Sequence, residues 1–180
     1  MDMADLVNGT MVRYLDANDI VARRSNSDSG HFSDAIPSLI VISEKYRRTG
    51  KDLLLAIVLV YELQAVLSET FHFMKRGYHP LSQVPWVLPI VLGRLMVASE
   101  NVALNAAALS GTLGMPINTW LRETSQSIPS IKGGAVGLAG QRAMQSLQLA
   151  ATGITGPSDS LETTIDILTP LSTEPPCLDR

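Results

Sequence analysis

Hydrophobic positions along this chain recur mostly with the spacing of an α-helix. Apolar side chains fall three or four positions apart between residues 3 and 15, and again between residues 34 and 50. The same spacing predicts further helices over 52–73, 82–98, 101–109 and 134–152. Residues 118–130 have weak periodicity and many hydroxyl side chains, so we expect a loop with a short helix there. The pattern predicts an all-α fold.

Several predicted helix ends carry start and stop signals. Asp34 stands where the N-cap of the second helix is expected, and Gly50 stands at the end of that helix. Ser99 occupies the N-cap position of the fifth predicted helix. Pro89 falls inside the fourth, so we expect that helix to be kinked.

The third predicted helix, over residues 52–73, is apolar on almost every side as far as Val60. A helix of this kind is typically enclosed, so we expect it at the centre of the domain. Its apolar run, residues 53–61, is shorter than the roughly 20 residues that a membrane-spanning helix needs, and the run over 84–97 is interrupted by Pro89 and Arg94. We therefore interpret both runs as buried core helices and predict no membrane partner.

Composition supports this interpretation and narrows the classes of function. Apolar residues make up 46% of the 180 positions and aromatic residues 5%, which favours close-packed helices over a β-sandwich. The formal net charge is −3 and no basic stripe is present, which gives no support for nucleic-acid binding. Cys177 is the single cysteine, so cysteines alone can build no disulfide framework, zinc site or iron–sulfur cluster. We predict neither a metal nor a cofactor.

The N-terminal segment bears on the cellular compartment. Residues 1–9, MDMADLVNG, carry two aspartates where a secretory or mitochondrial leader needs positive charge. We therefore expect a cytoplasmic chain. A mitochondrial location would require an N-terminus longer than this one.

The most polar stretch, residues 14–34, lies between two strongly apolar helical segments. It contains four aspartates, two arginines and one of the three histidines, together with small polar residues. Because protein scaffolds position functional groups on loops, we expect the site to be built here.

Several separated motifs occur in one order along the chain. LDAND at residues 15–19 is followed by GHFSD at residues 30–34. The others are GKDLLLAI at 50–57, YELQ at 61–64, RGYH at 76–79, Lys132 with Gly137, and GITGP at 153–157. Together they resemble the MmgE/PrpD family, which includes 2-methylcitrate dehydratases and cis-aconitate decarboxylases. The resemblance covers roughly residues 5 to 157.

The resemblance implies a fold and an assembly. Residues 1–157 would form part of a helical-bundle domain of the MmgE/PrpD type. Family chains are much longer and carry a separate α/β lid domain, which we do not expect here. Residues 158–180 no longer resemble the family, and their acids, hydroxyls and prolines predict a divergent, flexible tail. Family members form homodimers through their helical domains, so the same assembly is implied.

The resemblance also implies roles for individual residues. Family enzymes remove water or carbon dioxide from a tricarboxylic acid, which requires a proton-transferring group and cations for the carboxylates. His31 matches the histidine of the GH motif and would move the proton together with Asp16. His79 matches a second family histidine and is implied as a further catalytic residue that would help to bind or protonate the substrate. Lys132 would bind a substrate carboxylate.

Each of these residues also has an ordinary structural explanation. His31 would serve equally as a hydrogen-bonding residue that holds the loop closed, and His79 as a turn residue before a proline. Lys132 would be a solvated surface lysine.

The remaining candidates lie just after the first predicted helix. Asn18 and Asp19 are implied as substrate-binding residues, but such residues after a helix are often simple turn formers. Asp16 would equally pair with Arg23 or Arg24 in the polar stretch.

Three departures from the family motifs affect the interpretation. Ile20 stands where the family commonly has threonine, Phe32 replaces the proline of GHPSD, and Val60 replaces the glycine of GYE. A bulkier or more apolar substrate would explain these changes, and so would drift after loss of function.

The leading hypothesis is a lyase that dehydrates 2-methylcitrate or a related alkylcitrate, because the GH-x-SD form of the loop resembles the dehydratase branch. Decarboxylation of cis-aconitate is the closest enzymatic alternative. From a different class of function, a catalytically inactive truncated remnant or association module would explain the departures and the short chain.

Overall fold

The computed structural model describes residues 3–21, 29–71, 73–74, 77–115 and 130–168. These residues form α-helices and short 3-10 helices, and none of them lies in a β-strand. In chain order the elements are α1 (Met3–Tyr14), η1 (Phe32–Ala35), α2 (Ile36–Lys45), α3 (Gly50–Phe71), η3 (Pro80–Gln83), α4 (Val84–Met96), α5 (Glu100–Gly114), α6 (Ile131–Ala151) and α7 (Ser160–Leu168). The all-α fold predicted from the sequence is confirmed.

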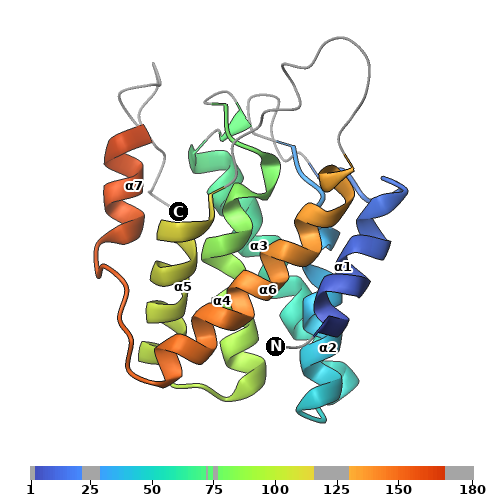
Figure 1. The fold of residues 1–180 in the computed structure, drawn as a ribbon, viewed down its shortest axis with the longest axis horizontal. Coiled ribbons are helices and arrows are strands. Elements are labelled where there is room, and N and C mark those ends of the chain that lie inside the picture. Colours follow the sequence, from blue (N-terminus) through green and yellow to red (C-terminus); the bar gives the residue numbers. More distant parts are fainter. Residues whose placement is uncertain (1–2, 22–28, 72, 75–76, 116–129, 169–180) are drawn as a thin grey trace.

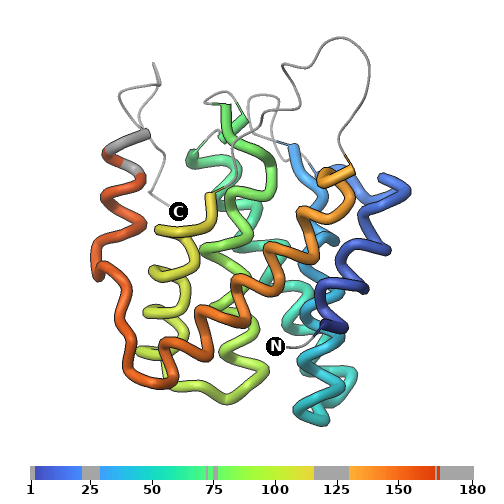
Figure 2. The backbone as a smooth tube through the Cα atoms, in the orientation of Figure 1, coloured from blue at the N-terminus to red at the C-terminus, as the bar shows by residue number. Residues whose placement is uncertain are grey.

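The helices form a bundle, and α6 crosses the face of it that Figure 1 presents. α6 packs against α1, α4 and α5, while α2 and α3 pack together and both against α4. α7 packs against α5 at one edge, opposite the edge formed by α1 and α2. The tube in Figure 2 shows the C-terminal end of α1 and the N-terminal end of α6 at the same end of the bundle.

The hydrophobic core lies between α2, α3, α4 and α6. Burying one large apolar side chain contributes about 1.5–3 kcal/mol, so the residues that are wholly enclosed fix how these helices are placed. They include Leu39, Ile42, Val60, Leu88, Leu92 and Leu147.

Glycines allow α1 and α6 to approach each other closely. A Cβ atom on Gly9 would lie 2.7 Å from Gly137 Cα, and a Cβ atom on Gly137 would lie 2.3 Å from the backbone oxygen of Leu6. No larger residue fits either position without moving a helix backbone. This contact places the last turn of α1 beside the first turn of α6.

Of the two N-caps predicted from the sequence, Ser99 is confirmed and Asp34 is not. Ser99 caps α5 as predicted, since its side chain accepts a hydrogen bond from the backbone N–H of Val102. The prediction of Asp34 as an N-cap is wrong. Asp34 lies inside η1, and α2 begins after Ala35, which makes no side-chain cap. The extra 3-10 turn buries Asp34 instead of leaving it at a helix end.

The prediction that the long apolar helix is enclosed is also wrong. α3 packs against α2 and α4, but Leu54 is 66% exposed and Val58 is 56% exposed. By length and composition α3 could cross a membrane, a test that core helices of soluble proteins also pass. α3 therefore has one packed side and one exposed apolar side.

The segment predicted as a divergent tail contains a helix. α7 runs from Ser160 to Leu168 and packs against α5. Ser160 is buried at its start, and Leu161 packs against the cluster that contains Phe71 and Phe73. Residues 169–180 lie outside the described part of the chain.

Candidate functional site

Backbone hydrogen bonds close the base of the polar stretch. The N–H of Val21 donates to the oxygen of Gly30 at 2.9 Å, and the N–H of Gly30 donates back at 3.0 Å. A Cβ atom on Gly30 would lie 3.2 Å from the side-chain nitrogen of Gln83 and 3.3 Å from the Phe32 ring, so the position is tight. This bridge places His31, the next residue, beside η1.

Asp16 lies two residues beyond α1 in a left-handed backbone conformation, with φ 54°. Aspartate tolerates this conformation better than most side chains. One carboxylate oxygen accepts a hydrogen bond from Lys132 Nζ at 2.5 Å, and the other lies 3.3 Å from the Arg13 guanidinium. The hydrogen bond from Lys132 and the charge of Arg13 outweigh the effect of burial and lower the pKa of Asp16. Asp16 is therefore a carboxylate at neutral pH.

Lys132 lies in the first turn of α6, where the helix macrodipole adds partial positive charge. The next residue, Gly133, lets α6 pass close to α1, since a Cβ atom there would lie 2.9 Å from the Tyr14 ring. The side chain of Lys132 is 25% exposed and that of Asp16 is 43% exposed. Solvent and a small anion can therefore reach this ion pair.

Arg13 is buried between two carboxylates. Its guanidinium lies 3.3 Å from Asp16 and 3.8 Å from Asp34. Burial raises the pKa of Asp34 to about 7, although the positive charge of Arg13 opposes the shift. Near neutral pH Asp34 therefore exchanges between its acid and carboxylate forms.

His31 is held by the loop that precedes it. Its Nδ1 lies 2.5 Å from the backbone oxygen of Asp19. Because a carbonyl oxygen can only accept a hydrogen bond, Nδ1 carries the proton and donates. In the neutral ring the lone pair is then on Nε2, so His31 has the form that a general base requires.

Asp19 and Asn18 bind groups of their own chain. The Asp19 carboxylate accepts hydrogen bonds from the Ser33 hydroxyl, from the Ser33 backbone N–H at 3.2 Å and from the Tyr61 hydroxyl at 3.0 Å. Asn18 donates to the Ser33 hydroxyl at 3.2 Å and to Asp34 at 3.4 Å. These contacts join the LDAND and GHFSD segments. Substrate binding by Asn18 and Asp19 stays a prediction.

His79 is buried at the start of η3. Its Nδ1 accepts a hydrogen bond from the backbone N–H of Leu81 at 3.1 Å, so the side chain caps this 3-10 helix. Burial lowers the pKa of His79 to about 4, and the charges of Arg13, Lys132 and His31 act in the same direction. The ring is therefore neutral at neutral pH, and His79 contributes hydrogen bonding but no positive charge.

Comparison with models of protein families shows to which family the chain belongs. A family model described as the MmgE/PrpD N-terminal domain matches residues 1–176. The chain belongs to the MmgE/PrpD family. The match extends beyond residue 157 and includes α7. A comparison with curated proteins found no match.

In this MmgE/PrpD domain the predicted residues gather at one end of the bundle. Asp16 and Lys132 contact each other directly, and the charge of His31 acts on both Asp16 and His79. Asp16 pairs with Arg13 and Lys132, while Arg23 and Arg24, the partners considered from the sequence, lie outside the described residues.

Two residues of the site were missed by the sequence analysis. Arg13 stands three positions before Asp16, which is the spacing of neighbours on a helix, and that signal was available. Tyr61 is 42 positions from Asp19, its hydrogen-bond partner, and no local pattern connects the two. Both residues belong to the polar site of the MmgE/PrpD domain, by which we mean the predicted residues at this end of the bundle together with Arg13 and Tyr61.

The residues that this structure describes include no group of three or more His, Cys, Asp or Glu side chains that could hold a metal ion. The charged groups of the site are instead paired with each other, as in the contacts of Asp16 with Arg13 and Lys132.

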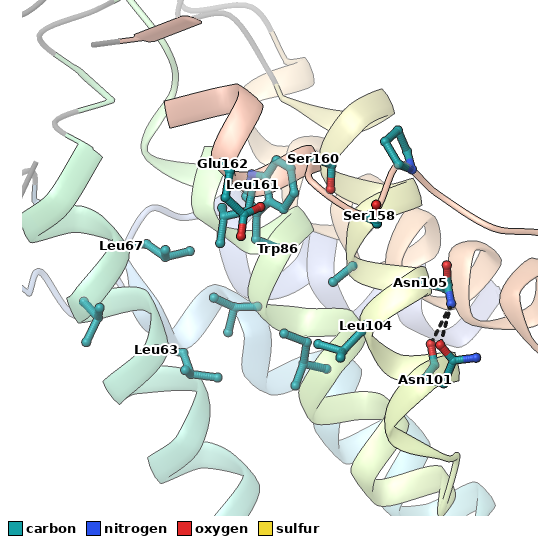
Figure 3. Close-up of a pocket in the computed structure, with 16 residues that line it drawn as sticks. Leu63, Leu67, Trp86, Asn101, Leu104, Asn105, Ser158, Ser160, Leu161 and Glu162 are labelled. Carbon is teal, nitrogen blue, oxygen red and sulfur yellow. Dashed lines mark hydrogen bonds between the residues drawn. The ribbon is translucent and has the colours of Figure 1, made fainter. Parts of the chain in front are cut away.

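A cavity of about 550 Å³ lies elsewhere in the domain, between α3, α4, α5 and α7. Figure 3 shows Leu63, Leu67, Trp86 and Leu104 around it, with Asn101 and Asn105 at one side. Its lining contains none of the site residues predicted from the sequence. This cavity and the polar site are therefore separate features.

Proposed function

We propose that this MmgE/PrpD chain acts in the dehydration of a tricarboxylic acid, with 2-methylcitrate or a related alkylcitrate as substrate. The observation that carries the proposal is the ion pair of Lys132 and Asp16 beside Arg13, at the bundle end where His31 lies. Two cations and a histidine are the groups that proton abstraction beside a carboxylate requires.

Lys132 would bind a substrate carboxylate. Its ammonium contacts Asp16, and both side chains are partly exposed. A substrate carboxylate can bind the ammonium beside Asp16, because the ammonium and the N-terminus of α6 both favour an anion. Asp16 would then orient the ammonium from its other side.

His31 would act as the base. Its Nδ1 donates to the backbone of Asp19, which leaves Nε2 to remove a proton from the carbon next to a substrate carboxylate. The electron pair of that C–H bond forms the new double bond, and the neighbouring hydroxyl leaves as water with the proton that His31 has taken and gives back. We propose His79, whose pKa of about 4 keeps the ring neutral, as a hydrogen-bonding residue for a substrate oxygen.

A second candidate is an association module, and the outer side of α3 favours it. Leu54, Leu55 and Val58 are each more than one third exposed on the same helix. A large exposed apolar surface is typical of an association site. We propose a homodimer in either case.

The experiment that tests the proposed function follows the reaction product. The purified chain is incubated with 2-methylcitrate and, separately, with cis-aconitate, and proton NMR records each mixture over time. Dehydration gives a new alkene with every carboxylate retained, whereas decarboxylation releases carbon dioxide. A folded chain that converts neither compound would contradict the enzyme proposal and leave the association module.

A further inference from the structure

We propose that Tyr61 is a positioning residue for His31. It acts through Asp19, whose backbone oxygen holds the His31 ring with Nε2 as the proton-accepting nitrogen. The claim that Tyr61 aids catalysis rests on the proposed function. The claim that Tyr61 fixes which nitrogen of the His31 ring carries the proton depends only on contacts within the chain.

The position of Asp19 decides which nitrogen of His31 is protonated. The separation of His31 Nδ1 from the Asp19 backbone oxygen is 2.5 Å, and hydrogen bonds weaken steeply when this geometry is lost. If the oxygen moves away, the ring is free to carry its proton on Nε2 instead. Nε2 would then have no lone pair with which to remove a substrate proton.

Within the described part of the chain, three donors hold the Asp19 carboxylate. Two belong to Ser33, its hydroxyl and its backbone N–H, and the third is the hydroxyl of Tyr61. Ser33 lies two residues after His31 in the same polar stretch, so these two bonds tie one part of the stretch to another. Tyr61 belongs to α3, so its bond ties Asp19 to a helix of the core.

The position of Tyr61 is itself well determined. The preceding residue, Val60, is fully buried in the core. The Tyr61 ring packs edge-on against Phe32, with ring centres 5.7 Å apart and an angle of 81° between the planes. One turn further along α3, Gln64 donates a hydrogen bond to the backbone oxygen of Phe32 at 3.2 Å. α3 therefore holds both Asp19, which bonds to the His31 ring, and Phe32, which follows His31 in the chain.

The Tyr61 hydroxyl is suited to donate to a carboxylate. Burial, together with the hydrogen bond and negative charge of Asp19, raises the pKa of Tyr61 to about 12. The phenol therefore keeps its proton across the neutral and mildly alkaline range. The Tyr61 hydroxyl and the Ser33 hydroxyl both donate to the Asp19 carboxylate, which accepts in each of these contacts.

The test compares Tyr61→Phe with Tyr46→Phe. The first change removes only the hydroxyl that reaches Asp19, and the second removes the hydroxyl of a tyrosine that is 37% exposed beyond α2. Nitrogen-15 NMR of the histidine rings at pH 8 reports which ring nitrogen carries the proton, and His31→Asn identifies the His31 signals. Thermal unfolding checks that each variant is folded.

We expect the wild type and Tyr46→Phe to show His31 with its proton on Nδ1. In Tyr61→Phe that form should no longer dominate, and both ring nitrogens should shift towards the averaged values of exchanging tautomers. An unchanged His31 ring in folded Tyr61→Phe would overturn the proposal. Asp19→Ala gives a second reading, because it removes the same carboxylate without changing α3, and it should have the same effect on His31.

The NMR result does not depend on turnover, so failure of the proposed function leaves it interpretable. If the chain is active, kcat of Tyr61→Phe should fall roughly tenfold with KM unchanged, because a base in the wrong tautomer slows proton transfer and leaves binding intact. A raised KM together with an unchanged His31 ring would instead mean that Tyr61 touches substrate, which contradicts a positioning role.

Discussion

Lys132 and Asp16 are 116 positions apart in sequence, and the Lys132 ammonium donates a hydrogen bond to the Asp16 carboxylate at 2.5 Å. The close contact of α1 with α6 brings the two residues together, and that contact depends on glycines where the backbones meet. The site thus depends on how two helices pack as much as on the charged residues themselves.

Replacing Lys132 should weaken substrate binding more than folding. A hydrogen bond to a charged group contributes about 1.5–3 kcal/mol, so Lys132→Met should lower the affinity for a tricarboxylate roughly 10- to 100-fold. The free energy of unfolding should change by less than about 1 kcal/mol, because the pair with Asp16 is partly exposed. Titration calorimetry with citrate and urea unfolding measure the two effects.

Lys51→Met is the matched control for this change. Lys51 is an exposed lysine in the first turn of another helix, α3, and has the same formal charge. Its replacement should leave the affinity for citrate unchanged. Equal losses in the two variants would mean that binding follows net charge and does not involve a Lys132 site.

The contact of α1 with α6 should not tolerate even one added methyl group. In Gly137→Ala the new Cβ atom would meet the backbone oxygen of Leu6 at 2.3 Å, and overpacking of this kind costs about 1–3 kcal/mol. Gly134→Ala adds the same atom to the same helix, where its nearest neighbour is 3.7 Å away, and should stabilise by up to about 1 kcal/mol. Urea unfolding of both variants checks the prediction. Similar results for the two would contradict the packing of α1 on α6.

His79 should make the fold sensitive to acid. Its pKa is lowered from 6.5 to about 4 by burial, so the unfolded chain binds a proton that the folded chain does not. The stabilising contribution is complete above pH 6.5 and is lost as the pH falls towards 4, by roughly 3 kcal/mol in total. His79→Asn keeps an acceptor for the Leu81 N–H and removes the titration. Its unfolding free energy should fall less steeply over this interval than that of the wild type.

Asp34 should make the fold less stable as the pH rises, which is the opposite of the effect of His79. Burial raises its pKa from 3.8 to about 7, so the folded chain holds a proton that the unfolded chain releases. Its contribution to stability is complete below pH 3.8 and is lost as the pH rises to 7. Asp34→Asn should therefore gain stability relative to the wild type as the pH increases from 4 to 7. Parallel stability curves for the two proteins would show that Asp34 is ionised throughout.

Sequence patterns predicted where the helices lie better than which of their side chains are buried and where the helices begin. The spacing of apolar residues identified the helical segments, but it could not show that Leu54 and Val58 stay exposed, because an apolar side chain does not reveal whether a partner covers it. The N-cap prediction for Asp34 failed because its backbone N–H bonds to the oxygen of His31 and forms a 3-10 turn first.

The motif order pointed to some residues of the candidate site and not to others. Asp16, His31 and Lys132 stand within motifs that resemble the family, so their positions could be predicted. Tyr61 lies in such a motif too, but its hydrogen bond to Asp19 depends on the rotation of α3 about its axis, which the buried Val60 sets. Contacts of this kind follow from tertiary packing and have no local signal.

In the proposed mechanism, His31 removes a proton from a carbon next to a substrate carboxylate. The most direct measurement incubates the chain with 2-methylcitrate in D₂O and records by proton NMR both alkene formation and exchange of the substrate C–H for deuterium. We predict that the wild type shows one or both, and that folded His31→Gln shows neither above the rate without protein. Equal rates of alkene formation in the wild type and His31→Gln would contradict this role of His31, and so would a folded wild type that leaves the substrate unchanged.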